Sequence, residues 1–238
     1  SKDYKILAVL DKDARLSDTA IAKSVGTSKQ VVRYRLKRLE EEKVIENYYT
    51  MLDVGQLGFD SYYVFVQLTG LNSEKESSLY TKIIKLPQVT WLITGVGRWD
   101  AVILFCATSI EIFNQQLSHF KKELGAHLHE LMFTSLIQAE HISYKFLDAK
   151  TNKHLKTTPK LKVNLKTHFL DEGDKKVLRT ISQSARLPIT EVADKTKLPV
   201  HTVHYKLKQL IKRHVIQGFR PKINVQKLGI QWYLLLIK

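Results

Sequence analysis

The sequence predicts an α+β protein in which two small helical modules flank an antiparallel βαββαβ unit. Residues 3–62 recur as residues 174–233, and between the two copies the hydrophobic pattern changes from helical spacing to strand alternation. The 238 residues also carry a formal net charge of +15 at pH 7, with a pI near 9.7. This charge favours a polyanionic partner, with nucleic acid first and an acidic membrane surface second.

The repeat runs without a gap at a constant offset of 171 (174 − 3). Each copy predicts three helices, which in the first copy cover residues 3–10, 17–24 and 28–42. Ser17 and Ser28 are good N-caps, and Gly26 supplies the turn between the second and third helices. A short helix, a glycine turn and a longer basic helix form a helix-turn-helix, whose second helix enters the major groove of DNA.

On the third helix, apolar residues at helical spacing form the buried face, and polar and basic residues lie on a separate face. The candidate DNA-binding residues are Ser28, Lys29, Gln30, Arg33, Tyr34, Lys37 and Arg38. By geometry we assign Gln30, Arg33 and Lys37 to base edges, and Lys29, Arg35 and Arg38 to phosphates. A merely solvated basic face is the alternative interpretation, but the turn, the repeat and the net charge favour DNA.

The second copy keeps this scaffold and changes the residues that would contact DNA. His201 and His204 stand where the first copy has Gln30 and Arg33. The candidate DNA-binding residues of this copy are His201, His204, Tyr205 and Lys208. Because histidine is mostly neutral near pH 7, we expect weaker binding or another base preference, and higher affinity as the pH falls. The alternative is that this module has become a protein-interaction domain.

Two replacements affect the backbone of the second copy. Lys197 takes the place of Gly26, and a positive φ there would cost on the order of 1 kcal/mol. Pro199 takes the place of Ser28, so the side-chain cap is lost, although proline is accepted at the first helical position.

Between the copies the order of predicted elements is βαββαβ, a ferredoxin-like arrangement. The predicted strands cover residues 62–69, 89–96 and 101–108, with a last one within 127–142, and the helices cover 73–85 and 109–124. The run GVGRWD joins two strands, so it is a hairpin turn and not a phosphate-binding loop, which would open a helix.

These features resemble the Lrp/AsnC family of prokaryotic transcription regulators. The resemblance rests on Val25-Gly26-Thr27-Ser28, then Val31-Val32 and Arg35-Leu36, followed by LGFDSYYVFV and the βαββαβ unit. It covers residues 3 to about 147 and again residue 174 to the end. It implies a regulator that binds double-stranded DNA, forms a homodimer or higher even oligomer through the βαββαβ domain, and senses an amino acid or related small molecule. It also makes Gly97, Trp99 and Asp100 candidate effector-binding residues, unless Gly97 serves the turn and Trp99 only packs against a neighbour.

Two other functions are alternatives to DNA-binding regulation. Siroheme decarboxylases resemble the same layout, but their His-Asn-Tyr run is replaced here by Val89-Thr90-Trp91-Leu92, and no nucleophile–base set stands out. We therefore expect that the protein is not an enzyme and that it binds no cofactor. The other alternative is a winged-helix scaffold that binds proteins instead of DNA.

We expect four parts: a helix-turn-helix at 1–58, a dimerisation and effector domain at 59–147, a lysine-rich linker at 148–172, and a second helix-turn-helix at 173–238. Within the linker, LKVNLKT alternates like an edge strand. Residues 233–237 would be the first strand of a second sheet domain, which either docks on a sheet edge or continues in a longer chain.

The remaining expectations concern location and metals. No run approaches the roughly 18 apolar residues of a membrane span, so we expect no membrane association. The single cysteine, Cys106, lies in an apolar run and favours a small core residue in a reducing cytoplasm. His127 and His129 fall on one face of a predicted strand, but without a Cys or carboxylate partner set we assign no metal.

Overall fold

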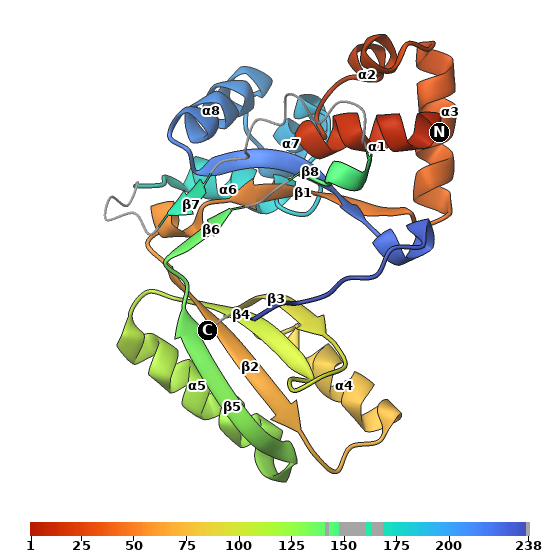
Figure 1. The fold of residues 1–238 in the computed structure, drawn as a ribbon. Coiled ribbons are helices and arrows are strands. Elements are labelled where there is room, and N and C mark those ends of the chain that lie inside the picture. Colours follow the sequence, from red (N-terminus) through yellow and green to blue (C-terminus); the bar gives the residue numbers. More distant parts are fainter. Residues whose placement is uncertain (141–142, 148–159, 163–168, 237–238) are drawn as a thin grey trace. The chain divides into compact units, whose positions relative to one another are not determined.

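The computed structural model describes residues 1–140, 143–147, 160–162 and 169–236, and these form two compact units. One unit contains residues 1–53, 140, 143–147 and 170–236, and the other contains residues 54–139, 160–162 and 169. Both helix-turn-helix modules therefore belong to the first unit, and the βαββαβ segment forms the second (Figure 1). None of the helices in the described part of the chain has the length and apolar character needed to cross a bilayer.

The N-terminal module has the three predicted helices, α1 (Lys2–Lys12), α2 (Asp18–Val25) and α3 (Lys29–Glu41). The predicted N-caps are confirmed. Ser17 Oγ accepts a hydrogen bond from the amide of Ala20 at 3.2 Å, and Ser28 Oγ accepts one from Val31 at 3.3 Å. Gly26 ends α2 with φ 69°. The apolar stripes of the three helices meet in one core, which includes Ile6, Leu7, Leu10, Ile21, Val32, Leu36 and Leu39.

The second module repeats this arrangement with α6 (Glu172–Ile181), α7 (Ile189–Thr196) and α8 (Val200–Lys212). Lys197 ends α7 with φ 59°, so the left-handed backbone of the glycine turn is retained without glycine. Pro199 does not occupy the first helical position. It is the N-cap itself, with φ −57° and ψ 144°, an extended conformation that suits proline. No side chain caps α8 there, as the sequence predicted.

The two modules are joined by a ribbon of two strands, β1 (Ile45–Leu52) and β8 (Ile216–Ile223), which pair antiparallel. Each strand follows the long helix of its module directly, so the pairing brings together residues far apart in the sequence (Figure 1). Neither segment was predicted to be a strand. Short 3₁₀ turns follow each strand, at Val54–Leu57 and Val225–Leu228.

The second unit has the predicted βαββαβ order. Its elements are β2 (Asp60–Leu68), α4 (Ser73–Ile83), β3 (Val89–Thr94), β4 (Ala101–Ala107), α5 (Ile110–Leu124) and β5 (Leu128–Ser135). The strands form one antiparallel sheet in the order β3-β4-β2-β5. Phe113, Phe120 and Leu124 of α5 pack with Ile83 of α4 against one face of this sheet, so the core lies between helices and sheet (Figure 1).

Three predicted features differ from the structure or lie partly outside the residues that it describes. His127 lies in a 3₁₀ turn, Gly125–His127, before β5 begins, so it does not share a strand face with His129. Described residues 233–236 form no strand, and their side chains are exposed. Of the predicted LKVNLKT strand at 161–167, only Leu161 and Lys162 are described, and residues 163–167 lie outside the described residues. Both belong to β7 (Lys160–Lys162), which pairs with β6 (Gln138–Glu140).

Candidate nucleic-acid interface

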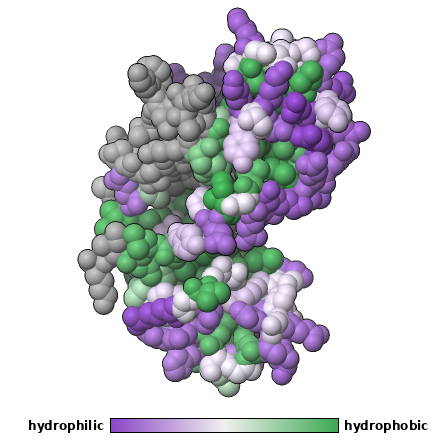
Figure 2. All heavy atoms as spheres, turned by 45° about the vertical axis from the view of Figure 1, so that its right-hand side comes forward, coloured by the Kyte–Doolittle hydropathy of each residue, from purple (hydrophilic) through white to green (hydrophobic). Residues whose placement is uncertain are grey.

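The exposed side of α3 carries the predicted DNA-contacting residues. Positions 29, 30, 33, 34 and 37 are all exposed, whereas Val32, Leu36 and Leu39 are buried. Tyr34, a large aromatic side chain, has 67% of its surface accessible. We call these five positions the recognition face of α3. Figure 2, in which α3 comes forward, shows that the outer surface of this module is mostly hydrophilic.

Two arginines of α3 have partners within the module. Arg35 Nη1 lies 2.8 Å from Asp3 Oδ1, and Arg38 Nη2 lies 2.7 Å from Asp3 Oδ2. Their side chains are 28% and 39% exposed. Both arginines thus pair with the same carboxylate, and these two ion pairs hold α3 against α1. The sequence assigned both arginines to DNA phosphates and did not predict this contact. Lys37, by contrast, is 75% exposed and only 3.7 Å from Glu41, a weak surface pair.

The second module presents the same face from α8. Positions 200, 201, 204, 205 and 208, each offset by 171 from the recognition face of α3, are all exposed. Tyr205 is 62% exposed, close to the value for Tyr34. The internal ion pair is also retained, because Lys206 Nζ lies 3.2 Å from Asp174 Oδ1, and these residues are the equivalents of Arg35 and Asp3. Both recognition faces are therefore held on equivalent scaffolds.

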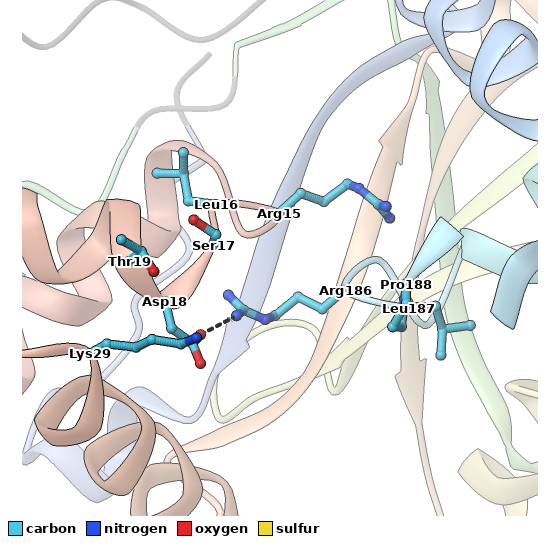
Figure 3. Close-up of a pocket in the computed structure, with 9 residues that line it drawn as sticks. All are labelled: Arg15, Leu16, Ser17, Asp18, Thr19, Lys29, Arg186, Leu187 and Pro188. Carbon is cyan, nitrogen blue, oxygen red and sulfur yellow. Dashed lines mark hydrogen bonds and ion pairs between the residues drawn. The ribbon is translucent and has the colours of Figure 1, made fainter. Parts of the chain in front are cut away.

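The loops before α2 and α7 meet within this unit and line a pocket of about 420 Å³. Its lining residues are Arg15, Leu16, Ser17, Asp18, Thr19, Lys29, Arg186, Leu187 and Pro188. Figure 3 shows Arg186 extending from the α6–α7 loop toward Asp18 at the start of α2, where Nη2 and Oδ1 are 3.1 Å apart. Lys29, the first residue of α3, lies in the same wall. This meeting of loops was not predicted, and the identical Ala-Arg-Leu in both copies is its only signal in the sequence.

The predicted effector loop is the hairpin turn between β3 and β4, as expected. The Gly95 amide donates to the Asp100 carbonyl at 3.1 Å, and Asp100 Oδ2 accepts from the Leu68 amide at 2.7 Å. Trp99 packs on Phe65, with ring centroids 5.8 Å apart. Gly97 has φ 155°. Asp100 and Trp99 therefore both have structural contacts, and any effector role must be compatible with them.

The cysteine and the histidine singled out in the sequence both lie in structural positions. Cys106 is buried, which confirms its place in the core. His127 Nδ1 lies 3.2 Å from the Thr69 carbonyl. Among the described residues, no group of three or more His, Cys, Asp and Glu side chains could hold a metal ion.

The three-helix modules, the basic exposed face and the ribbon together define a winged helix-turn-helix protein. The family model for winged helix-turn-helix DNA-binding domains matches residues 1–46 and 170–217, once in each module.

The transcriptional regulator Ptr1 of Methanocaldococcus jannaschii is 30% identical over 118 residues, covering 49% of this chain and 77% of Ptr1. LrpA of Pyrococcus horikoshii is 41% identical over 75 residues, covering 32% of this chain and half of LrpA. Among solved structures, the siroheme decarboxylase NirDL superposes with a TM-score of 0.56 at 14% identity, covering 93% of this chain and 65% of NirDL. At that identity the likeness concerns the fold alone. The chain belongs to the Lrp/AsnC family of transcription regulators.

Proposed function

We propose that this protein regulates transcription by binding duplex DNA through the recognition faces of α3 and α8. The observation that supports this most is the repeated exposure of the same five positions on two helices with equivalent scaffolds. A helix of this kind, following a short helix and a tight turn, fits the major groove. The net charge of +15 supplies the long-range attraction for the phosphate backbone.

The ion pairs of α3 support a refined proposal for the roles of the first module's residues. We propose that Gln30, Arg33 and Lys37 face base edges, and that Ser28, Lys29 and Tyr34 lie at the margin of the groove near phosphates. Arg38, like Arg35, is paired with Asp3, so its main role in this proposal is to hold α3 against α1. In the second module His201, His204, Tyr205 and Lys208 take the corresponding places.

Replacing Arg33 tests this assignment. Arg33→Ala should reduce discrimination between a preferred duplex and a scrambled one by about 1–3 kcal/mol, because a bidentate contact to guanine is lost. The measurement is competition binding by fluorescence anisotropy, on duplexes first selected from a random pool with the unaltered protein. Lys121→Ala is the matched control, because it also removes one positive charge, but from the exposed side of α5 in the other unit. It should leave discrimination unchanged. Equal discrimination by Arg33→Ala and the unaltered protein would show that Arg33 does not contact bases.

We further propose that the protein dimerises through the βαββαβ unit and works in the cytoplasm, where its DNA is. The helices α4 and α5 pack on one face of the sheet, and the other face includes Trp91 and Met132, which are 42% and 43% exposed. An apolar sheet face of this kind fits a second copy of itself.

The effector proposal concerns the β3–β4 hairpin with Gly97, Trp99 and Asp100. We propose that an amino acid or related small molecule binds beside Trp99. Trp99→Phe should abolish any ligand-dependent rise in melting temperature across a panel of amino acids, measured relative to the ligand-free variant because Trp99 also packs on Phe65. An unchanged ligand response in this variant would remove Trp99 from the effector site.

We propose a regulator and not a catalyst. The likeness to NirDL extends over most of the chain, but the residues that mark the decarboxylases are absent from β3, which reads Val89-Thr90-Trp91-Leu92. Haem-like absorbance in the purified protein would instead favour the enzyme.

A further inference from the structure

The pairing of β1 with β8 places a twofold axis inside a single chain. At the centre of the ribbon Tyr49 lies opposite Arg220, and because 220 is 49 plus 171, these two residues are equivalents in the two copies. On either side of this central pair the register is symmetric: Tyr48 faces Pro221, and their equivalents, Phe219 and Thr50, face each other. In an antiparallel pair this register means that a half-turn about the Tyr49–Arg220 pair exchanges the two strands.

The contacts around the ribbon are related by the same twofold axis. The Ala14 amide donates to the Phe219 carbonyl, and the Ala185 amide donates to the Tyr48 carbonyl, each at 2.9 Å. The cation–π contacts are equally reciprocal. The Arg15 guanidinium lies 5.4 Å from the ring centroid of Phe219, and the Arg186 guanidinium lies 5.2 Å from that of Tyr48.

A second set of hydrogen bonds is reciprocal between the two modules. Arg15 Nη1 donates to the Ala185 carbonyl, and Arg186 Nη1 donates to the Ala14 carbonyl. At the ribbon ends, the amide of Asp53 donates to the Val215 carbonyl at 3.0 Å, and the amide of Asn224 donates to the Val44 carbonyl at 2.9 Å. The interface between the modules is therefore isologous, as between two subunits, although one polypeptide supplies both sides.

This symmetry fixes how the two recognition helices are presented. α3 leads into Ile45, which lies opposite Ile223 at the end of β8, and α8 leads into Ile216, opposite Leu52. The helices thus enter the eight-residue ribbon from opposite ends, roughly 26 Å apart at about 3.3 Å per residue. Adding half a helix diameter, about 5 Å, at each end of the ribbon brings the distance between the two recognition helices close to one DNA turn of about 34 Å.

The two recognition faces are symmetric in backbone and unlike in chemistry. Tyr34 and Lys37 recur as Tyr205 and Lys208. The other three positions change: Lys29, Gln30 and Arg33 become Val200, His201 and His204. A long cation and a bidentate guanidinium are therefore replaced by an apolar side chain and an imidazole. Side chains this different do not prefer the same base edges.

We propose that one chain recognises one operator composed of two unlike half-sites, in inverted orientation and about one helical turn apart. α3 contacts one half-site and α8 the other. This inference rests on the proposed DNA binding and adds that the target is not a true palindrome. A symmetric homodimer of single modules would select two identical halves, whereas this covalent pair selects two different ones.

The test is selection from a duplex pool with about 30 randomised base pairs, using the full chain. The unaltered protein should enrich a site with two different halves whose centres lie about 10 base pairs apart. The variant Val200→Lys, His201→Gln, His204→Arg gives α8 the residues of α3 at exposed positions, so it should enrich an inverted repeat of the first half. The reciprocal variant Lys29→Val, Gln30→His, Arg33→His should enrich an inverted repeat of the second half. His119→Gln on the exposed side of α5 is the matched control and should change neither half.

The outcomes separate this inference from the function on which it rests. An inverted repeat selected by the unaltered protein, or a single half-site, would overturn the inference while DNA binding stands. Enrichment of unlike halves that does not change in the α8 variant would overturn it as well. A pool in which no sequence is enriched, by a protein whose circular dichroism shows it folded, would overturn the proposed function itself.

Discussion

At the residue scale, the two modules differ in how they form the same left-handed turn. Gly26 has φ 69° and Lys197 has φ 59° at equivalent positions. A side chain with Cβ is strained there by roughly 1 kcal/mol, whatever its neighbours. Lys197→Gly should therefore raise the free energy of unfolding by about 1 kcal/mol, and Gly26→Ala should lower it by a similar amount. Because a Cβ on Gly26 would meet no atom within 4 Å, the loss would come from the backbone alone.

Urea unfolding followed by circular dichroism measures both changes. Asp194→Gly, at an exposed position within α7, is the matched control and should destabilise, since glycine in a helix costs about 1 kcal/mol. A Lys197→Gly protein no more stable than the original would show that the left-handed turn carries no strain.

Residue patterns predicted the position of the basic face but not the ion pairs that two of its arginines make. Helical spacing is enough to place Arg33 and Lys37 outward, because it depends only on the helix itself. The partnership of Arg35 and Arg38 with Asp3 depends on where α1 crosses α3, which no local pattern contains. The repeat held an indirect signal, since an aspartate is present at the equivalent position 174 and a lysine at 206.

At the element scale, one buried ion pair breaks the symmetry between the modules. Asp11 of α1 and Arg220 of β8 are 3.3 Å apart with side chains 2% exposed, and their equivalents are Ser182 and Tyr49. Burial raises the pKa of the Asp11 carboxyl, although Arg220 opposes the shift. Asp11→Ser alone should destabilise the fold by about 3–5 kcal/mol, because it leaves the guanidinium buried and unpaired.

The double change Asp11→Ser, Arg220→Tyr should recover much of that loss. It replaces both charges with the residues that the other copy carries at these positions, and removing a whole buried pair is often close to neutral. Thermal and denaturant unfolding of the two single variants and the double variant complete the cycle. Additive losses would mean that the two side chains do not stabilise each other.

The reciprocal arginines should couple the two modules. Arg186 donates to the Ala14 carbonyl at 2.8 Å, pairs with Asp18 and lies over Tyr48. Arg186→Ala should lower the free energy of unfolding by about 1.5–3 kcal/mol, the range for hydrogen bonds that involve a charge. Arg179→Ala on the exposed side of α6 is the control and should change little. An unfolding transition that stays at the same denaturant concentration in Arg186→Ala would contradict a coupling role.

Element by element, the βαββαβ unit was predictable and the ribbon was not. The strands and helices of that unit carry their own alternation or helical spacing over six or more residues, and Gly125 marks a helix end. β1, with the sequence IENYYTML, has no clean alternation, and its partner lies 171 positions away in the chain. The gapless repeat predicted two equal modules, but a sequence comparison cannot show that equal modules pair with each other.

At the scale of the whole molecule, the proposed dimerisation through the sheet face that carries Trp91 would set how many DNA-binding modules act together. Tyr63 and Trp91 meet edge to face at 6.2 Å on this face, and Met132 lies on it as well. If two chains join here, as proposed, each assembly holds two ribbons and four recognition helices. Such an assembly would engage two bipartite operators, or one long bent site, with much higher avidity than a single chain.

Trp91→Glu should therefore halve the mass measured by sedimentation equilibrium at micromolar concentration. A carboxylate buried in an apolar interface loses its hydration without gaining a partner, which costs several kcal/mol. The monomer should still bind one operator through its ribbon, but it should lose the tighter, cooperative binding to DNA that carries two operators. Ile112→Glu, on the helix side of the unit and 38% exposed, adds the same charge and should leave the mass unchanged. A Trp91→Glu protein that keeps both its mass and its cooperativity would mean that chains associate through some other surface.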